Sequence, residues 1–279
     1  MIGMKRFGQR WRTWMLIACL SWGLIVTLSP SAHSQSWLQM LFQGVQVLQL
    51  SNLSPRQEVN LGQQINQQLL NQGQFRPVRN RPLNEYINEI GQRLAQNSDR
   101  PDLPYTFQVV NDRAINAFAT MGGFVYINTG TILAADNEAE LASVIAHEIG
   151  HITARHSVTR MRDMALSQGL MTAAGLQEST IVNMGVQLAV NLPMSREAEM
   201  EADQLGLKML TRAGYAPIGM VNFMKKLQSK GGSPPEILSS HPDTQNRVIA
   251  LQRKISPEWA EQGAGLDSKA YKDQLQSFR

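Results

Sequence analysis

Cysteine is almost missing from this sequence, since Cys19 is the only one among 279 residues. It lies inside an apolar run near the N-terminus, so a chain without that run contains no cysteine. This absence excludes disulfide bonds, thiol catalysis and cysteine-ligated zinc modules from the rest of the chain.

Charged residues are missing between Arg12 and Arg56. Four basic residues lie at or before Arg12, and the remaining chain contains 22 basic and 22 acidic side chains. A balanced chain offers no basic surface of the kind that binds the phosphates of nucleic acid. We therefore expect no nucleic-acid partner.

A long hydrophobic run is also absent, because residues 14–28 form an apolar stretch of only 15 residues where a membrane span needs about 20. The four basic residues precede it, and the small residues Ala32 and Ser34 follow it. This order is typical of a secretory signal peptide. We predict a signal peptide at residues 1–35 and a periplasmic or secreted protein. An uncleaved signal that anchors the chain in a membrane is the alternative.

The segment after the predicted signal, residues 36–54, is uncharged and has apolar residues three and four positions apart. This spacing predicts an amphipathic helix, which packs on the main domain or contacts another surface. In the second case, residues 36–50 would bind a membrane surface or an envelope partner. We assign residues 55–257 to the main domain and residues 258–279 to a C-terminal tail.

The periodicity of the main domain changes along the chain. Residues 55–97 have the apolar spacing of two helices, whereas residues 105–112 and 124–128 are rich in β-branched and aromatic residues and predict strands. Beyond these, a helix at about 137–156 and another at about 195–213 are predicted. The chain should therefore adopt an α+β fold that is mostly helical with a small β-sheet.

The stretch "VIAHEIGHITARH" places three polar residues, His147, Glu148 and His151, inside an apolar run. On a helix, residues four apart project from one face, so both histidines can bind one metal ion. Glu148 points elsewhere, but it can take a proton from a water molecule that zinc has acidified. The H-E-x-x-H spacing thus predicts a zinc hydrolase site with Glu148 as general base.

A catalytic zinc needs a third protein ligand, and the acidic segment at residues 195–206 is the best source of one. Glu199 and Asp203 lie on one face of the predicted helix. We assign Glu199 as the third ligand and Asp203 as a residue that orients a ligand histidine. Glu197 and Glu201 are expected to be solvated.

Four segments together resemble the gluzincin metallopeptidases that include HtpX, BepA and the CAAX prenyl proteases. They are "NAFATMGGFVYINTG", "AHEIGHITARH", "SREAEMEADQLG" and "SSHPDTQNR", in this order, and the resemblance covers roughly residues 55–255. It implies a zincin-like fold with an HExxH helix and one Zn²⁺ per chain. The ligands would be His147, His151 and Glu199, and Asp203 would match the aspartate of the family's E-x-E-A-D motif.

The resemblance also assigns roles outside these helices. His241 matches a histidine placed near the metal, as a fourth ligand at rest or as a donor to the transition state. Arg247 matches the basic position of the same block. Asn116 matches the N-A-F-A block, and the following strand, with Gly123 and Val125, resembles the edge along which substrate binds.

Together these features predict a zinc-dependent endopeptidase that cleaves unfolded or extended polypeptides, such as exported or misfolded envelope proteins, in protein quality control. Unlike the membrane-embedded members, the chain lacks membrane helices around the site, so prenylated substrates are not expected. One alternative is a metal-containing chaperone or binding module without proteolysis. The other is a structural envelope protein without a metal.

Overall fold

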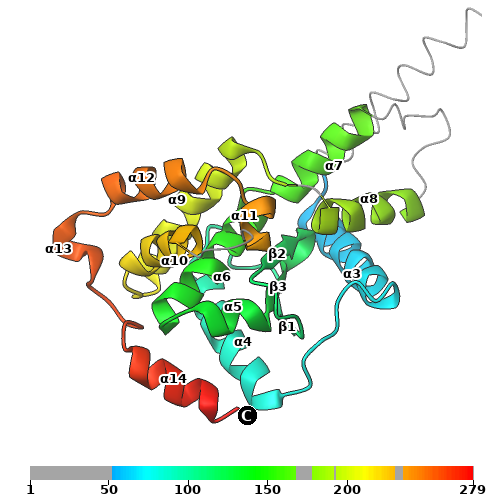
Figure 1. Cartoon of the computed structure of the whole chain (residues 1–279). Helices are drawn as coiled ribbons and strands as arrows, with labels where there is room; N and C mark the ends of the chain where they lie inside the picture. The colour runs from blue at the N-terminus through cyan, green and yellow to red at the C-terminus, as the bar shows by residue number, and fades with distance from the viewer. Residues whose placement is uncertain (1–51, 168–177, 192, 230–234, 279) are drawn as a thin grey trace, which may run out of the picture. The chain divides into compact units, whose positions relative to one another are not determined.

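The computed structural model describes residues 52–167, 178–191, 193–229 and 235–278. These residues all belong to one compact unit, and element labels follow Figure 1. The predicted signal peptide, and all but the last three residues of segment 36–54, lie outside the described residues.

The described elements are helices that precede and follow a short sheet. The first half contains α3 (Pro55–Asn71), α4 (Arg81–Ala95), β1 (Thr106–Val110), β2 (Ala117–Thr120), the 3₁₀ turn η1 (Met121–Gly123), β3 (Phe124–Asn128), α5 (Thr129–Ala134) and α6 (Glu138–Thr153). The second half contains α7 (His156–Ser167), α8 (Glu178–Asn191), α9 (Arg196–Arg212), α10 (Ile218–Ser229), α11 (Glu236–Ser240), α12 (Thr244–Lys254), α13 (Pro257–Ala260) and α14 (Ser268–Gln276). The mostly helical α+β class is thereby confirmed.

The sheet has three strands in the order β1-β3-β2, with β3 parallel to β1 and antiparallel to β2. The strands at 105–112 and 124–128 were predicted correctly, but β2 was not foreseen. Its four residues, "AFAT", include two alanines and show no apolar and polar alternation that would predict a strand. Because β2 pairs with β3, β3 is the central strand of the sheet and not an edge strand.

Strand β3 is buried on both faces, which explains its continuous apolar sequence. Val125 and Ile127 face a core that includes α4, α6, α9 and α10. Phe124 and Tyr126 face a second core that includes α3, α7 and α8. Since alternate residues of a strand point to opposite faces, the sheet lies between these two groups of helices, as Figure 1 shows.

Helix α6 is the central helix of the domain, with nearly every residue buried. Its N-cap is Asn137, whose side chain accepts a hydrogen bond from the Glu140 amide. Its closest partner is α9, and a Cβ at Gly150 would lie only 2.6 Å from the Ala202 carbonyl oxygen. Glycine at this position therefore lets the two helices approach closely enough to share a site.

Helix boundaries differ slightly from those predicted. The expected helix at 137–156 ends at Thr153, and α7 begins anew at His156. Between them, Arg155 has a left-handed backbone (φ 59°), which a continuous helix does not allow. The helix expected at 195–213 is α9, which Ser195 caps by accepting a hydrogen bond from the Ala198 amide.

Residues 258–278, which we assigned to a C-terminal tail, contain a helix that packs on the main domain. The Tyr271 side chain of α14 is buried in the α4–α6 core, and its hydroxyl donates to the Ile132 carbonyl at 2.7 Å. None of the described helices is long and apolar enough to cross a bilayer.

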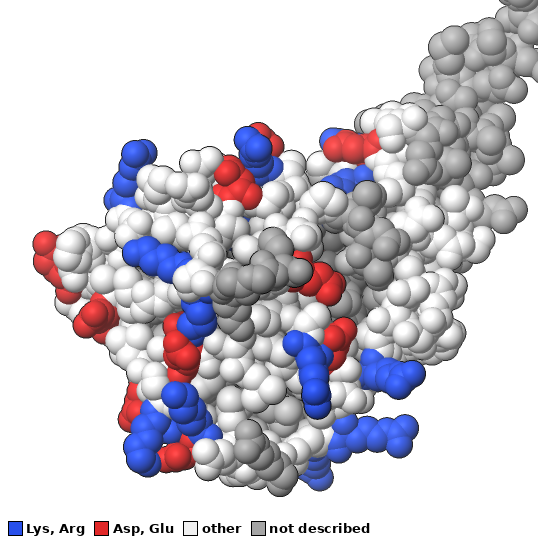
Figure 2. Space-filling view, in the orientation of Figure 1, with Lys and Arg blue, Asp and Glu red and all other residues white. Residues whose placement is uncertain are grey.

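Charges of both signs are interspersed over the face of the domain shown in Figure 2.

Candidate metal centre

Helix α6 places His147 and His151 one turn apart on its buried face, as the spacing predicted. Their Nε2 atoms lie 3.0 Å from each other. Both side chains are almost inaccessible, with 6% and 1% of the residue surface exposed. Two buried imidazoles whose ring nitrogens face each other are arranged like a pair of ligands for one ion.

Helix α9 brings a fully buried carboxylate to these nitrogens. Glu199 Oε2 lies 3.4 Å from His147 Nε2, and Glu199 Oε1 lies 3.4 Å from His151 Nε2. The close α6–α9 packing at Gly150 makes this approach possible. The structure thus brings together the three ligands expected from the sequence.

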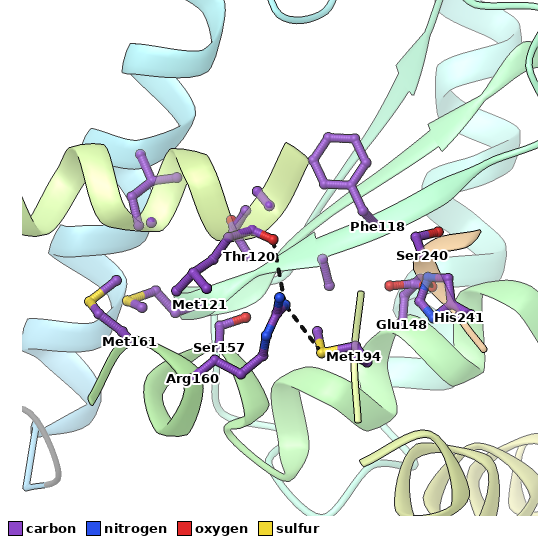
Figure 3. Close-up of a pocket in the computed structure, with 15 residues that line it drawn as sticks. Phe118, Thr120, Met121, Glu148, Ser157, Arg160, Met161, Met194, Ser240 and His241 are labelled. Carbon is purple, nitrogen blue, oxygen red and sulfur yellow. Dashed lines mark hydrogen bonds and ion pairs between the residues drawn. The ribbon is translucent and has the colours of Figure 1, made fainter. Parts of the chain in front are cut away.

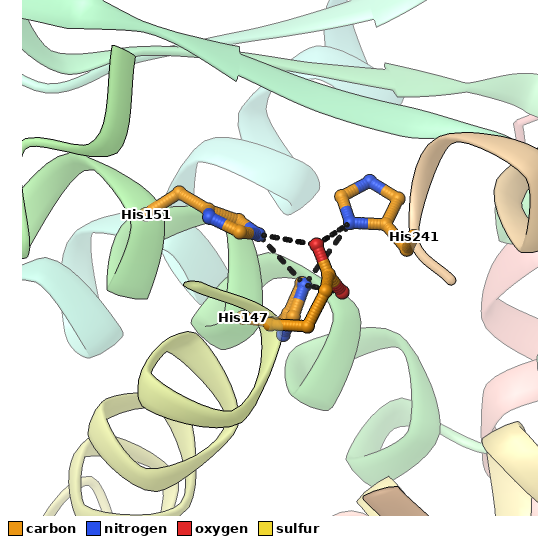
Figure 4. A group of neighbouring side chains, drawn as sticks. His147, His151 and His241 are labelled. Carbon is orange, nitrogen blue, oxygen red and sulfur yellow. Dashed lines mark hydrogen bonds and ion pairs between the residues drawn. The ribbon is translucent and has the colours of Figure 1, made fainter. Parts of the chain in front are cut away.

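His241, at the end of α11, completes the group. Its Nδ1 atom lies 3.0 Å from Glu199 Oε1 and 3.2 Å from His147 Nε2. One candidate ligand atom from each of the four residues lies within 4.8 Å of all the others. Figure 4 shows the three labelled rings converging on this point. His241 is buried, with 6% exposure, and is not a surface loop residue.

The outward nitrogen of each ring is engaged elsewhere, which leaves the inward nitrogens as acceptors. His147 Nδ1 lies 2.9 Å from Asp203, and His151 Nδ1 lies 2.8 Å from His156. His241 Nε2 is 3.4 Å from the Ala117 carbonyl oxygen, to which it can donate. Inward lone pairs crowded around a carboxylate repel one another unless a cation lies among them. This donor set, three imidazoles and a carboxylate, fits zinc.

Glu148 lies on the same helix, and its carboxylate faces the group without joining it. Its Oε1 atom is 3.5 Å from His241 Nε2. The atom is buried and accepts no hydrogen bond from the described residues. A buried carboxylate oxygen without a donor is costly unless water or a ligand supplies one, so this oxygen has an open position for a reacting molecule.

His147 is held from behind by a buried ion pair. The side chains of Asp203 and Arg247 meet in two contacts of 2.7 Å, and both are nearly fully buried. The third Arg247 nitrogen, Nη1, lies 2.6 Å from Glu199. Asp203 and Arg247 therefore lie beside the candidate ligands. Arg247 contacts Glu199 directly and His147 through Asp203.

The electrostatics of the group follow from burial and from these contacts. Burial and the Arg247 guanidinium lower the pKa of His147, but hydrogen bonds with Asp203 and Glu199 outweigh them and raise it to about 9. Burial would also raise the pKa of Glu199, yet the surrounding imidazoles hold it far below its usual range. For Glu148, burial prevails and raises the pKa.

Two cavities flank the group, and Glu148 and His241 line both of them. The first, which we call the β2-side cavity, is also lined by Phe118, Thr120 and Met161, and by further residues of α7, α8 and the segment before α9. Figure 3 shows Glu148 and His241 at one end of it and Met161 at the other. The second, the α10-side cavity, has apolar walls formed by Val144, Met220, Phe223, Met224, Leu227 and Ile237.

The predicted substrate edge is wrong. Strand β3, with Gly123 just before it and Val125 within it, is paired on both sides and has no free edge. The edge strand beside the site is β2, whose Phe118 and Thr120 line the β2-side cavity. Strand order depends on long-range pairing, which the local sequence did not reveal.

Asn116, which we assigned to the substrate edge, lies directly before β2 and contacts α11. Its side-chain amide donates to Glu236 at 2.8 Å, and its carbonyl oxygen lies 3.3 Å from the Ser240 hydroxyl. The Ile237 amide also donates to the Ile115 carbonyl. These bonds tie α11, and with it His241, to the start of β2.

Sequence reasoning missed His156, the partner of His151. Three of the five histidines fall between residues 147 and 156, which was the available signal. A continuous helix would have turned His156 away from His151, and the break at Arg155 carries no glycine or proline to announce it.

Comparison with known proteins identifies a family and several relatives. The profile of Peptidase family M48 matches residues 82–255. The beta-barrel assembly-enhancing protease of Escherichia coli is 35% identical over 223 residues, which cover 74% of this chain and 45% of that protein. A putative beta-barrel assembly-enhancing protease of Vibrio cholerae is 36% identical over 62% of this chain and 39% of that protein. The mitochondrial metalloendopeptidase OMA1 of Arabidopsis thaliana is 35% identical over 51% of this chain and 30% of its own length. The chain therefore spans less than half the length of these relatives.

Proposed function

The chain belongs to peptidase family M48, and from this premise we propose that it is a zinc-dependent endopeptidase. The observation that carries the proposal is the buried group of His147, His151, Glu199 and His241 beside the open carboxylate of Glu148. The family and the donor set together indicate a metal ion. Zinc is our assignment, with His147, His151 and Glu199 as its permanent ligands.

Glu148 is the general base of the proposed reaction. When bound, zinc polarises the scissile carbonyl and makes water more acidic. The open Oε1 atom of Glu148 accepts a proton from the attacking water and returns it to the leaving amine. Its raised pKa brings the carboxylate closer to the working pH, which favours both transfers.

His241 controls access in this account. With the ring as the structure has it, the fourth donor position is filled, and Nε2 lies beside the Ala117 carbonyl on the edge of β2. An incoming polypeptide needs both places, so α11 must shift and loosen its bonds to Asn116. Substrate favours that shift by binding the open state better. In the open state His241 becomes available as a donor to the transition state.

This model predicts that His241→Ala retains zinc and binds a hydroxamate inhibitor more tightly than the wild type, because the fourth position is free. The inhibitor constant and the zinc content of both proteins test it. A variant with unchanged inhibitor binding would show that His241 does not occupy that position.

The proposed substrate is an unfolded or extended polypeptide that pairs with the edge of β2. Main-chain pairing with an edge strand tolerates many side chains, and Phe118 and Thr120 of β2 line a cavity that Glu148 and His241 also line. Such breadth suits the quality control of exported or misfolded envelope proteins. The names of the two bacterial relatives, which refer to beta-barrel assembly, and the predicted signal peptide at residues 1–35 support a periplasmic or secreted location.

Glu148→Gln tests the enzyme against the alternative of a chaperone or binding module. The amide keeps the shape of the side chain but cannot act as a base. We expect the variant to keep one zinc per chain and to cleave unfolded casein at least about 10³-fold more slowly. Glu197→Gln, which changes an exposed carboxylate on α9, is the matched control and should cleave normally. Equal cleavage by Glu148→Gln and wild type would refute the enzymatic proposal.

A further inference from the structure

His156 is a buried histidine that the proposed reaction does not use. It begins α7 and is 7% exposed. Its Nδ1 atom lies 2.8 Å from His151 Nδ1, and the two rings meet at 66°. Its Nε2 atom lies 3.2 Å from Glu201 on α9. A chain of three side chains thus runs from the candidate metal ligand His151 to a largely exposed carboxylate, since 61% of the Glu201 side chain is accessible.

The proton positions in this row of three side chains follow from the ligand role of His151. Its Nε2 atom faces the other ligand atoms, so that nitrogen must keep its lone pair and Nδ1 must carry the proton. His151 Nδ1–H then donates to His156 Nδ1, which must be an acceptor. The proton of a neutral His156 therefore lies on Nε2, where it is donated to Glu201. One arrangement satisfies every nitrogen.

The backbone is shaped to bring the two rings together. In a continuous helix, a residue five positions after His151 would be rotated by about 140° from it and would point away. The left-handed backbone at Arg155 breaks the helix and turns His156 back onto His151. This conformation is held by the Arg155 side chain, which donates to the Leu53 carbonyl at 2.8 Å and lies 3.3 Å from the buried carboxylate of Glu58. A residue type that rarely adopts this backbone is thus secured by two contacts at the point where His156 needs it.

We propose that His156 is a positioning residue for the metal centre, which holds the ring of His151 in the tautomer and orientation that bind the ion, with Glu201 as its outer anchor. The inference rests on the proposed metal site but adds a residue to it. Partners of this kind fix the ring and increase its basicity, and their loss typically weakens metal affinity by about 10- to 100-fold. The effect acts through His151 and needs no contact between His156 and substrate.

Two substitutions at His156 separate hydrogen bonding from packing. His156→Leu fills the space but removes the acceptor. In His156→Asn, the side-chain oxygen takes the place of Nδ1, so the acceptor for His151 remains while the link to Glu201 is lost. We expect zinc affinity to fall about 10- to 100-fold in the leucine variant and to stay within about threefold of the wild type in the asparagine variant. Competition with a chromogenic chelator measures both dissociation constants without any assay of cleavage.

If His156 only packs, the order reverses, because leucine fills the site and asparagine leaves a gap. The proposal would be overturned if the His156→Leu protein bound zinc as tightly as the wild type. It would also be overturned if the His156→Asn protein bound zinc as weakly as the His156→Leu protein. Should the leucine variant fail to fold, the asparagine variant and ¹⁵N NMR of the histidine rings in the zinc-loaded wild type decide. A proton on Nε2 of His156 supports the proposal, and a proton on Nδ1 contradicts it. If the wild-type protein did not bind zinc, the metal site itself would be refuted. This outcome is distinct from a failure of the positioning role of His156.

Discussion

The two histidines of α6 are both proposed metal ligands, but different groups hold their rings in place. His147 leans on a buried charge, Asp203, which Arg247 holds in two short contacts. His151 leans on a neutral ring, His156, whose anchor is a carboxylate at the surface. The first support is an ion pair shielded from water, and the second is a polar chain that leads out to water.

The two supports differ in how their removal affects folding and metal binding. A buried ion pair contributes little net stability, but the removal of one partner leaves the other charge without compensation. A neutral chain with a solvated end can lose its anchor, and water takes its place. Stability and metal binding should therefore depend together on Asp203. His156 should affect metal binding more than folding, and Glu201 should affect both only slightly.

The largest expected effect is that of Asp203→Ala. The substitution leaves the buried Arg247 guanidinium with Glu199 as its one remaining carboxylate partner, beside longer contacts to His241 and His147. We therefore expect a loss of about 3 kcal/mol in the free energy of unfolding and at least about a 100-fold loss of zinc affinity. Urea unfolding of the metal-free protein and chelator competition measure the two quantities. A metal-free Asp203→Ala protein as stable as the wild type would show that the buried pair is not what holds this region.

The pH dependence of zinc binding should reveal the charged support next. With its pKa raised to about 9, His147 in the metal-free protein holds a proton that zinc must displace. Affinity should therefore fall by about tenfold for each pH unit below 9, with about one proton released per zinc bound. Asp203→Asn removes one of the causes that raise the pKa, so its proton release at pH 8 should be smaller. Calorimetry in buffers of different ionisation enthalpy counts these protons, and a wild-type affinity that is flat between pH 7 and 9 would contradict the assignment.

The smallest effect is expected for Glu201. Since its side chain is largely exposed, Glu201→Ala should change the free energy of unfolding by less than about 1 kcal/mol. Zinc affinity should fall by less than about threefold, because water can accept the proton of His156. The same unfolding and competition measurements apply, and a loss as large as that of Asp203→Ala would remove the contrast between the two supports.

Local periodicity was enough to predict part of this centre. His147, Glu148 and His151 follow from one helical spacing, and Glu199 and Asp203 follow from another on α9. His241 lies 90 residues beyond His151, so no local pattern relates them, and only the family resemblance placed it near the metal. Strand β2 and His156 were missed for a similar reason. The first depends on pairing with β3, and the second depends on a backbone break that the tertiary contacts of Arg155 stabilise.

Anomalous diffraction at the zinc absorption edge, from crystals of the inactive Glu148→Gln protein, would locate the metal ion. We expect one peak per chain, about 2.0 to 2.2 Å from His147 Nε2, His151 Nε2 and a Glu199 oxygen. With the substituted side chain beside it, the ion should have His241 or water as its fourth ligand. A peak at any other group of side chains, or none in protein saturated with zinc, would contradict the account.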